Sequence, residues 1–192
     1  MTVRGERQTK ETAIQMQLGK GTGPSTIETG LGFFDHMLEL LAFHGQLELD
    51  VSCDGDLHVD GHHTVEDVGI LFGELLQELA GDKRAIRRYG HAYVPMDESL
   101  ARVVVDVSGR PYLSCQAKLS AAQVGHFDTE LVEEFFRAVC INARWTCHMD
   151  LLRGGNTHHE IEALFKAFGQ ALAVALADSG VDRVPSTKGV IQ

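Results

Sequence analysis

The sequence lacks long apolar runs and an excess of basic residues. None of its apolar stretches reaches the roughly 18 residues that a membrane-spanning helix needs. The N-terminal stretch MTVRGERQTKET is polar and contains no apolar core of a secretory signal. The formal net charge is -10, which argues against a nucleic-acid-binding surface. We therefore expect a cytoplasmic protein that binds neither membranes nor nucleic acid.

Several catalytic and cysteine motifs are also missing. The four cysteines form no CxxC pair, so we expect reduced thiols in a cytosolic protein. HExxH is absent, which removes the usual metalloprotease arrangement. No GxSxG, P-loop or GxGxxG stands before a suitable helix, so acyl transfer and nucleotide binding have no motif support. With 44% apolar residues, the 192-residue chain can still bury a packed core.

The sequence does contain one helical motif that occurs twice. The stretch GHHTVEDVGILFGELLQEL at 61–79 reappears 96 positions later as NTHHEIEALFKAFGQAL at 156–172. The apolar residues of both copies fall at helical spacing, which indicates one amphipathic helix in two versions. The shift is half the chain length, which indicates two fused halves. Three polar positions match: His62 and His158, His63 and His159, and Glu66 and Glu162.

The other segments support the same division. Each half reads as strands, a helix, strands and a second helix. The first half has a strand at 12–19, a helix at 32–45, strands within 46–60 and a helix at 61–79. The second half has strands at 91–109 and 110–119, a helix at 127–143, a strand at 144–155 and a helix at 156–172. The sequence thus predicts an α+β fold of two tandem similar halves, 1–88 and 89–192. Each half is expected to have a small, mainly antiparallel sheet with two helices packed on one face. The last residues, 178–192, are expected to form a tail.

The repeated histidines and carboxylates have the spacing of metal ligands. Residues four apart lie on the same helix face, so His62 and Glu66 can reach one ion. The next residue, His63, points about 100° away, toward a different ion. His36 lies in the preceding helix of the first half. If the loop that follows this helix is two residues shorter in the second half, the matching position there is Glu134. The two predicted ligand sets are His36, His63, His158 and Glu162, and Glu134, His159, His62 and Glu66.

Imidazoles and carboxylates without thiolates suit Mn, Fe or Zn. Four protein ligands leave open positions on a six-coordinate ion, which favours Mn or Fe with a role in substrate binding over a closed structural Zn site. For an isolated pair of adjacent histidines, solvated side chains at a helix N-terminus are the better interpretation. Two such helices at an internal repeat favour a metal site.

Five motifs follow one another along the chain, and several of them are long: GLGFFDHMLELLAFHG, DGHHTVEDVGI, SGRPYL, NTHHEIEALFKAFGQAL and PSTKG. In this order they resemble one enzyme family, imidazoleglycerol-phosphate dehydratase of histidine biosynthesis, from about Arg7 to Lys188. The resemblance implies the monofunctional form, two Mn ions per active site, and a shell of 24 subunits with active sites between subunits. The ligand sets therefore need not come from one chain. The family often has His where this chain has Glu134.

The implied reaction is loss of water from imidazole-glycerol phosphate to give imidazole-acetol phosphate. The proton that leaves is on a carbon with no carbonyl beside it, so a base alone is poorly matched to its removal. An imidazole ring held at both nitrogens by metal ions becomes an imidazolate and can push electrons toward the departing hydroxyl. This chemistry requires the two ions to lie near each other.

The resemblance also implies roles for residues outside the metal ligands. Glu11 is the expected acid and base. Arg88, Arg110 and the stretch Ser186, Thr187 and Lys188 are expected to bind the phosphate. The full set expected to contact substrate is Glu11, His36, His44, His62, Arg88, Arg110, His158, Lys166, Ser186, Thr187 and Lys188. We expect His58, His91, His126 and His148 to be structural or surface residues.

Two other classes of function remain open at this point. A metal-nucleated assembly protein would use the same ligands, but it would not need Glu11, Arg88, Arg110 or Lys188. A di-metal oxidoreductase would place its carboxylates in a four-helix bundle. The many strand-like segments count against that arrangement.

Overall fold

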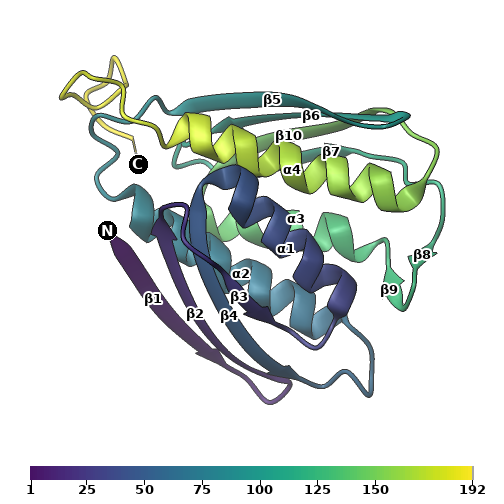
Figure 1. Cartoon of the computed structure of the whole chain (residues 1–192). Coiled ribbons are helices and arrows are strands. Elements are labelled where there is room, and N and C mark those ends of the chain that lie inside the picture. The colour runs from purple at the N-terminus through teal and green to yellow at the C-terminus, as the bar shows by residue number, and fades with distance from the viewer. Residues whose placement is uncertain (192) are drawn as a thin grey trace.

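The structure, a computed structural model, describes residues 1–191. Within this range, four helices form a layer between two four-stranded sheets (Figure 1). One sheet and two helices come from each half of the chain, and strand order and helix placement are the same in both. The predicted α+β fold of two similar halves is thereby confirmed.

The first half runs through six elements. The sheet has the order β1-β2-β4-β3; β3 pairs with β4 in parallel, and the other pairs are antiparallel. The elements are β1 (Thr2–Gln8), β2 (Thr12–Lys20), β3 (Thr26–Glu28), α1 (Gly32–Gly45), β4 (Leu47–Gly55) and α2 (His62–Ala80).

The second half repeats this plan with one added hairpin. The sheet has the order β5-β6-β10-β7, and β7 pairs with β10 in parallel. The corresponding elements are β5 (Tyr89–Met96), β6 (Ser99–Asp106), β7 (Tyr112–Gln116), α3 (Leu131–Ala143), β10 (Thr146–Arg153) and α4 (Thr157–Ala175). The added hairpin is β8 (Gln123–Val124) with β9 (Phe127–Asp128).

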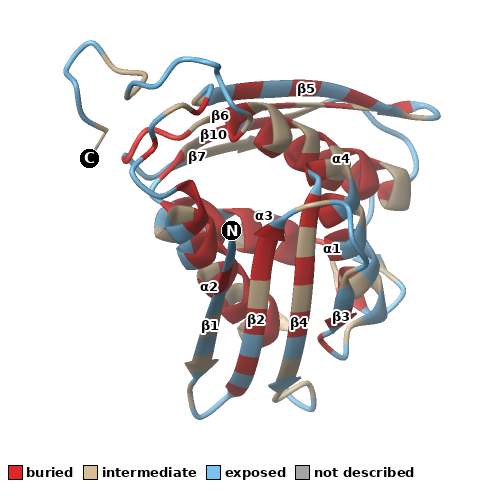
Figure 2. Ribbon diagram, turned by 60° about the vertical axis from the view of Figure 1, so that its left-hand side comes forward, coloured by how far each residue is buried: buried red, intermediate tan, exposed pale blue. Residues whose placement is uncertain are grey.

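Alternation of apolar and polar residues turns one face of each sheet toward the helices. In β2 the side chains of Ile14, Met16 and Leu18 are buried, and the residues between them are mostly exposed. Figure 2 shows this alternation as bands along β2 and β5. The inward faces of both sheets and the apolar sides of the helices join in one hydrophobic core. The division at residues 88 and 89 stays a prediction, because this core runs through both halves.

Two glycines that match in the repeat let helices of different halves cross closely. α2 packs against α3, and α4 packs against α1. A Cβ atom on Gly73 would lie 2.6 Å from the carbonyl oxygen of Val139. A Cβ atom on Gly169 would lie 2.5 Å from the carbonyl oxygen of Leu41. Only glycine allows backbones to approach this closely, so Gly73 brings α2 beside α3 and Gly169 brings α4 beside α1.

The helix ends support the alignment of His36 with Glu134. Helix α1 ends at Gly45 and α3 at Ala143, and the capping residues that follow, Gln46 and Arg144, have left-handed backbone with φ of 52° and 58°. These caps are 98 positions apart, as are His36 and Glu134. The two residues therefore occupy the same place in corresponding helices.

Several local predictions differ from the structure, and β3 and the hairpin of β8 and β9 were not expected. Strand β1 was not expected, because its outward side chains are polar; the alternation that buries Val3 is too short to stand out. The predicted strand after Gly55 is instead a turn before α2. There, Asp60 accepts a hydrogen bond from the His62 backbone N–H at 2.8 Å, which satisfies the first N–H of α2. No helix in the described range is long and apolar enough to cross a membrane.

Candidate active site

The crossing of α1 and α4 gathers three of the predicted metal ligands. Ligand atoms of His36, His158 and Glu162 all lie within 4.8 Å of one another. The Nε2 of His158 is 3.2 Å from Oε2 of Glu162, and the Nε2 of His36 is 3.9 Å from the same oxygen. The two histidines are partly exposed, and only 9% of the Glu162 side chain is accessible. These three side chains could hold a metal ion, and the exposure of the two imidazoles leaves room for further ligands.

Lys166 and His44 continue this cluster along the same helices. Burial alone would raise the pKa of Glu162, but the hydrogen bond and charge of Lys166, with His158 and His36, bring that pKa below its ordinary value. The pKa of His44 is lowered, first by burial and then by the Lys166 charge, against a smaller effect of Glu162. Glu162 is therefore ionised and His44 neutral near pH 7.

The second histidine of each pair faces away from this cluster and contacts a different carboxylate. The Nδ1 of His159 is 3.1 Å from Glu98, and Asp97 completes a group of three possible ligands. The pKa of Glu98 is lowered to about 2 by its own backbone N–H, by His159 and by the Asn156 N–H. In the first half, the Nδ1 of His63 is 2.9 Å from Asp56.

Glu11 lies near His63, in the turn between β1 and β2. The pKa of His63 is raised mainly by its hydrogen bond to Asp56, and the negative charges of Asp56 and Glu11 add to this. The turn is held firmly, because the neighbouring Thr12 donates a hydrogen bond of 2.5 Å to buried Asp67. The expected acid and base thus has a fixed backbone.

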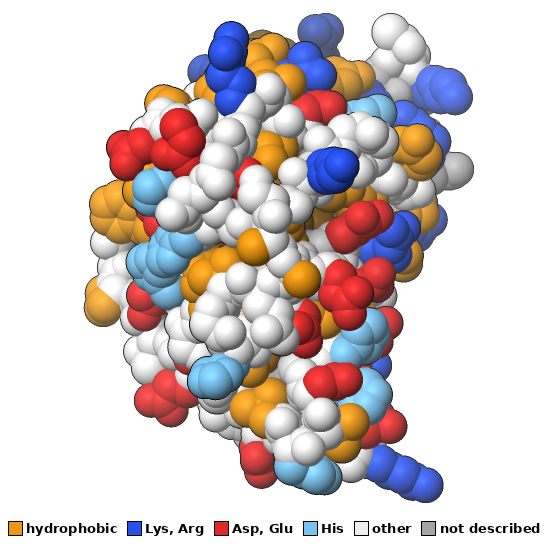
Figure 3. Space-filling view, turned by 90° about the vertical axis from the view of Figure 1, so that its right-hand side faces the viewer, with side chains coloured by type: hydrophobic (Ala, Val, Ile, Leu, Met, Phe, Trp, Pro, Cys, Tyr) orange, Lys and Arg blue, Asp and Glu red, His pale blue; other side chains and the backbone are white. Residues whose placement is uncertain are grey.

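The four residues of the second predicted ligand set do not all lie together within this chain. The Nε2 of His62 is 3.8 Å from Glu66 one turn later, as the spacing predicts. Glu134 lies 4.0 Å from Arg137 and joins neither metal-competent group among residues 1–191. Figure 3 shows histidines beside acidic side chains on the face at this end of the helices. That the ligand sets are completed between chains stays a prediction.

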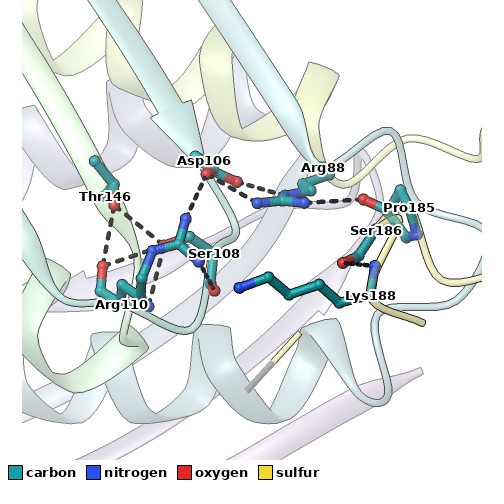
Figure 4. A network of polar contacts seen from close by, with 8 residues as sticks. All are labelled: Arg88, Asp106, Ser108, Arg110, Thr146, Pro185, Ser186 and Lys188. Atoms are coloured by element: carbon teal, nitrogen blue, oxygen red, sulfur yellow. Dashed lines mark hydrogen bonds and ion pairs between the residues drawn. The ribbon is translucent and has the colours of Figure 1, made fainter. Parts of the chain in front are cut away.

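The expected phosphate-binding residues do come together. A cavity of about 830 Å³ is lined by the expected residues Arg88, Arg110, Ser186, Thr187 and Lys188, with Ser108 and Tyr89 among the others. Figure 4 shows the cationic side chains on one side of Asp106. Arg88 donates to both oxygens of Asp106, at 2.7 and 3.2 Å, and to the carbonyl of Pro185 at 2.9 Å. Arg183 also lines this cavity, so four cations and several hydroxyl and N–H donors suit an anion.

This pocket and the histidine clusters lie at opposite ends of α4. The backbone N–H of Arg88 donates to Ala175, the last residue of α4, at 2.9 Å. His158 is in the first turn of the same helix. The 17 residue steps from His158 to Ala175, at about 1.5 Å each, span about 26 Å. The anion pocket and the histidine clusters are therefore well separated within one chain.

Three side chains near the site were not predicted from the sequence: Asp56, Glu98 and Asp106. Each contacts a predicted site residue through the fold, and no sequence motif shows such a contact. A comparison of strand starts could have found Glu98, because Glu98 precedes β6 as Glu11 precedes β2. The histidines expected at the surface, His58, His91, His126 and His148, are all exposed.

The donor set fits a divalent ion of intermediate hardness. It consists of imidazoles and carboxylates, and the thiols lie outside both metal-competent groups of the described chain. All four cysteines carry free thiols, as expected. The eight strands of the two sheets exclude the four-helix bundle of a carboxylate-bridged oxidoreductase.

Known proteins share both the sequence and the fold. A family sequence profile described as imidazoleglycerol-phosphate dehydratase matches residues 29–172. The protein of that name from an Exiguobacterium species is 60% identical over 188 residues, which cover 97% of this chain and 96% of that protein. Its counterpart in Staphylococcus aureus is 58% identical over the full length of both.

Solved structures agree with these relatives. The crystal structure of imidazoleglycerol-phosphate dehydratase from Staphylococcus aureus N315 superposes with a TM-score of 0.86 at 55% identity, covering 93% of this chain and 99% of that one. The enzyme from Pyrococcus furiosus, crystallised with (S)-C348, gives a TM-score of 0.85 at 39% identity, with coverages of 97% and 99%. The histidine clusters, the anion pocket and these likenesses together place the chain in the imidazoleglycerol-phosphate dehydratase family.

Proposed function

We propose that the chain is a Mn-dependent dehydratase whose active sites are shared between subunits. It removes water from imidazole-glycerol phosphate and releases imidazole-acetol phosphate. The family membership supports the reaction, which makes the chain a carbon–oxygen hydro-lyase of histidine biosynthesis. The cytoplasm suits this role and the free thiols.

The separation of the two parts of the site is the observation that carries the shared-site proposal. The phosphate pocket and the histidine clusters are about 26 Å apart along α4, yet the substrate needs both. If the C-terminal end of α4 in one copy of the chain lies beside the N-terminal end of α4 in another copy, one substrate can reach both parts. A closed symmetric assembly repeats the same contact between identical subunits, and we propose a shell of 24 subunits.

The positions of the candidate ligands also support metal sites that are shared between two copies of the chain. His36, His158 and Glu162 offer three ligands on one chain, and His63 of a second copy would complete the set. His62 and Glu66 offer two ligands on one chain, and His159 and Glu134 would complete the other set. Glu134 replaces an imidazole with a carboxylate, which Mn accepts.

Each group of the chain then has one task. Two Mn ions would supply Lewis acidity at both ring nitrogens, so that the substrate ring is held between them as an imidazolate. Glu11 takes the proton from the substrate carbon and delivers a proton to the departing hydroxyl, which leaves as water, and the enol that remains ketonises. Arg88, Arg110 and Lys188 neutralise the phosphate, and the Ser186 and Thr187 side chains can donate to its oxygens.

We propose that Lys166 and His44 bind the middle of the substrate. Lys166 donates to Glu162 beside the three-ligand cluster and lies 3.8 Å from the sulfur of Met96. Its ammonium can therefore orient both a ligand carboxylate and a substrate hydroxyl. Neutral His44 can accept or donate a hydrogen bond without adding charge.

The test combines metal analysis, mass measurement and an assay with imidazole-glycerol phosphate. The proposal expects Mn in the purified protein, an assembly of 24 subunits, and turnover that a chelator abolishes and added Mn restores. A metal-loaded assembly without turnover would favour the metal-nucleated assembly protein instead. Turnover by an isolated single chain would contradict the shared active site.

A further inference from the structure

The five imidazoles around the helix ends make two kinds of contact. His36, His62 and His158 turn Nε2 toward a carboxylate that belongs to the predicted ligand sets, Glu162 or Glu66. His63 and His159 instead turn Nδ1 toward carboxylates outside those sets. The second histidine of each pair is thus held by a residue with no predicted role.

The two contacts have the same chemistry. Asp56 lies 2.9 Å from Nδ1 of His63, and Glu98 lies 3.1 Å from Nδ1 of His159. A carboxylate that accepts the Nδ1 proton leaves the lone pair on Nε2, where it can bind a metal ion. Such a partner sets the tautomer and orientation of a ligating histidine, and its loss typically weakens metal binding by about 10- to 100-fold.

The two carboxylates come from different places in the repeat. Glu98 directly precedes Ser99, the first residue of β6, and Glu11 directly precedes Thr12, the first residue of β2. Glu98 and Glu11 are therefore counterparts. Asp56 directly follows β4, whereas β10 is followed by Gly154, which has no side chain.

We propose that Asp56 and Glu98 are positioning residues that hold His63 and His159 with Nε2 free for an ion of a neighbouring subunit. Because Asp56 performs this task in the first half, Glu11 is left free for proton transfer. In the second half, where no carboxylate follows β10, the counterpart of Glu11 performs it instead. This inference rests on the proposed function.

Further contacts hold both carboxylates in place. Glu98 accepts a hydrogen bond of 2.8 Å from the backbone N–H of Asn156 and one of 3.2 Å from the Ser99 hydroxyl. The backbone N–H of Asp56 donates to the carbonyl of Glu11 at 3.0 Å. That bond joins the turn that carries the acid and base to the turn that orients the histidine.

The experiment measures Mn affinity of the assembled protein by electron paramagnetic resonance of free Mn. We expect Asp56→Asn and Glu98→Gln to weaken Mn binding about tenfold or more. The controls are Asp54→Asn, an exposed neighbour on β4, and Glu78→Gln, which is exposed on α2. Both should bind Mn as the wild type does. The melting temperature of the metal-free protein should stay unchanged in all four variants, because none removes core packing.

Turnover at rising Mn concentration separates positioning from catalysis. Excess Mn should restore turnover in Asp56→Asn and Glu98→Gln but not in Glu11→Gln. Asp56→Glu, which returns a carboxylate, should recover part of the affinity. Wild-type Mn affinity in both variants would overturn this inference alone. A wild-type protein that binds no Mn would overturn the proposed metal sites and this inference with them.

Discussion

Asp106 accepts two hydrogen bonds from Arg88, at 2.7 and 3.2 Å, and lies 3.5 Å from the guanidinium of Arg110. One carboxylate thus holds both arginines at the anion pocket (Figure 4). The pair also raises the pKa of Arg88, chiefly through the hydrogen bond to Asp106. With only 11% of the Arg88 side chain exposed, this ion pair fixes the direction of its charge.

Replacing Asp106 should therefore weaken substrate binding. Asp106→Asn removes the charge that aligns Arg88 and Arg110, and we expect KM for imidazole-glycerol phosphate to rise about tenfold, or about 1.4 kcal/mol, with kcat less affected. Steady-state kinetics and Mn content are the measurements. Asp54→Asn is the matched control, and a lower kcat with unchanged KM would contradict the positioning of the phosphate cations.

Glu11 is expected to act only in proton transfer. Glu11→Gln keeps the size of the side chain but cannot take up a proton, so turnover should be abolished while Mn content and assembly persist. Metal analysis, native mass spectrometry and the dehydratase assay provide the three readouts, with Glu6→Gln on β1 as the control. Near-normal activity in Glu11→Gln would remove this residue from the mechanism.

His62 is expected to bind metal and support assembly. His62→Ala deletes one ligand of a shared set, so Mn content should fall and the assembly should dissociate more readily. His58→Ala, four residues earlier in an exposed turn, should change neither property. The ligand scheme would be wrong if His62→Ala formed an intact oligomer with full metal content.

Gly169 should be intolerant of any side chain. A Cβ atom there would lie 2.5 Å from the Leu41 carbonyl and 3.0 Å from the Gly45 nitrogen, both backbone atoms that cannot move alone. We expect Gly169→Ala to lower the free energy of unfolding by about 1–3 kcal/mol and to disturb the cluster of His36 and His158. Gly32→Ala, where a Cβ meets nothing within 4 Å, is the control. Equal denaturation midpoints for both variants would refute the close crossing.

The thiols should react slowly in the folded protein. Burial raises the pKa of Cys53 and of Cys115 to about 11, from 9.0. Because the thiolate is the reactive form, this rise in pKa lowers the thiolate population of each of the two cysteines about 100-fold at pH 8. A thiol-specific chromogenic reagent should label these cysteines slowly in the native state and rapidly in denaturant. Fast labelling of the native protein would show that these thiols are not buried as described.

The ligand types and the repeat could be predicted because they are local. Spacing of four places His62 beside Glu66 and His158 beside Glu162 on any α-helix, whatever surrounds it. The doubled helix likewise implied two similar halves. Strand β1 and the turn after Gly55 were misread because short segments with polar outward faces carry little periodicity.

The contacts between residues far apart in the sequence could not be predicted in this way. His36 and His158 are 122 positions apart and come together only because glycine lets α4 cross α1 at backbone distance. Asp56, Glu98 and Asp106 have roles only through the residues that they touch. The separation of the anion pocket from the histidines is equally a result of packing, since Arg88 is joined to the far end of α4.

The fold class, the two-fold internal repeat and the kinds of candidate ligand could be predicted from the sequence, because these depend on periodicity along the chain. Only the folded chain shows which predicted ligands lie together, which carboxylates contact them, and that the anion pocket and the histidine clusters lie at opposite ends of α4. These properties depend on distances between residues far apart in the sequence, and close packing of helices and sheets sets those distances.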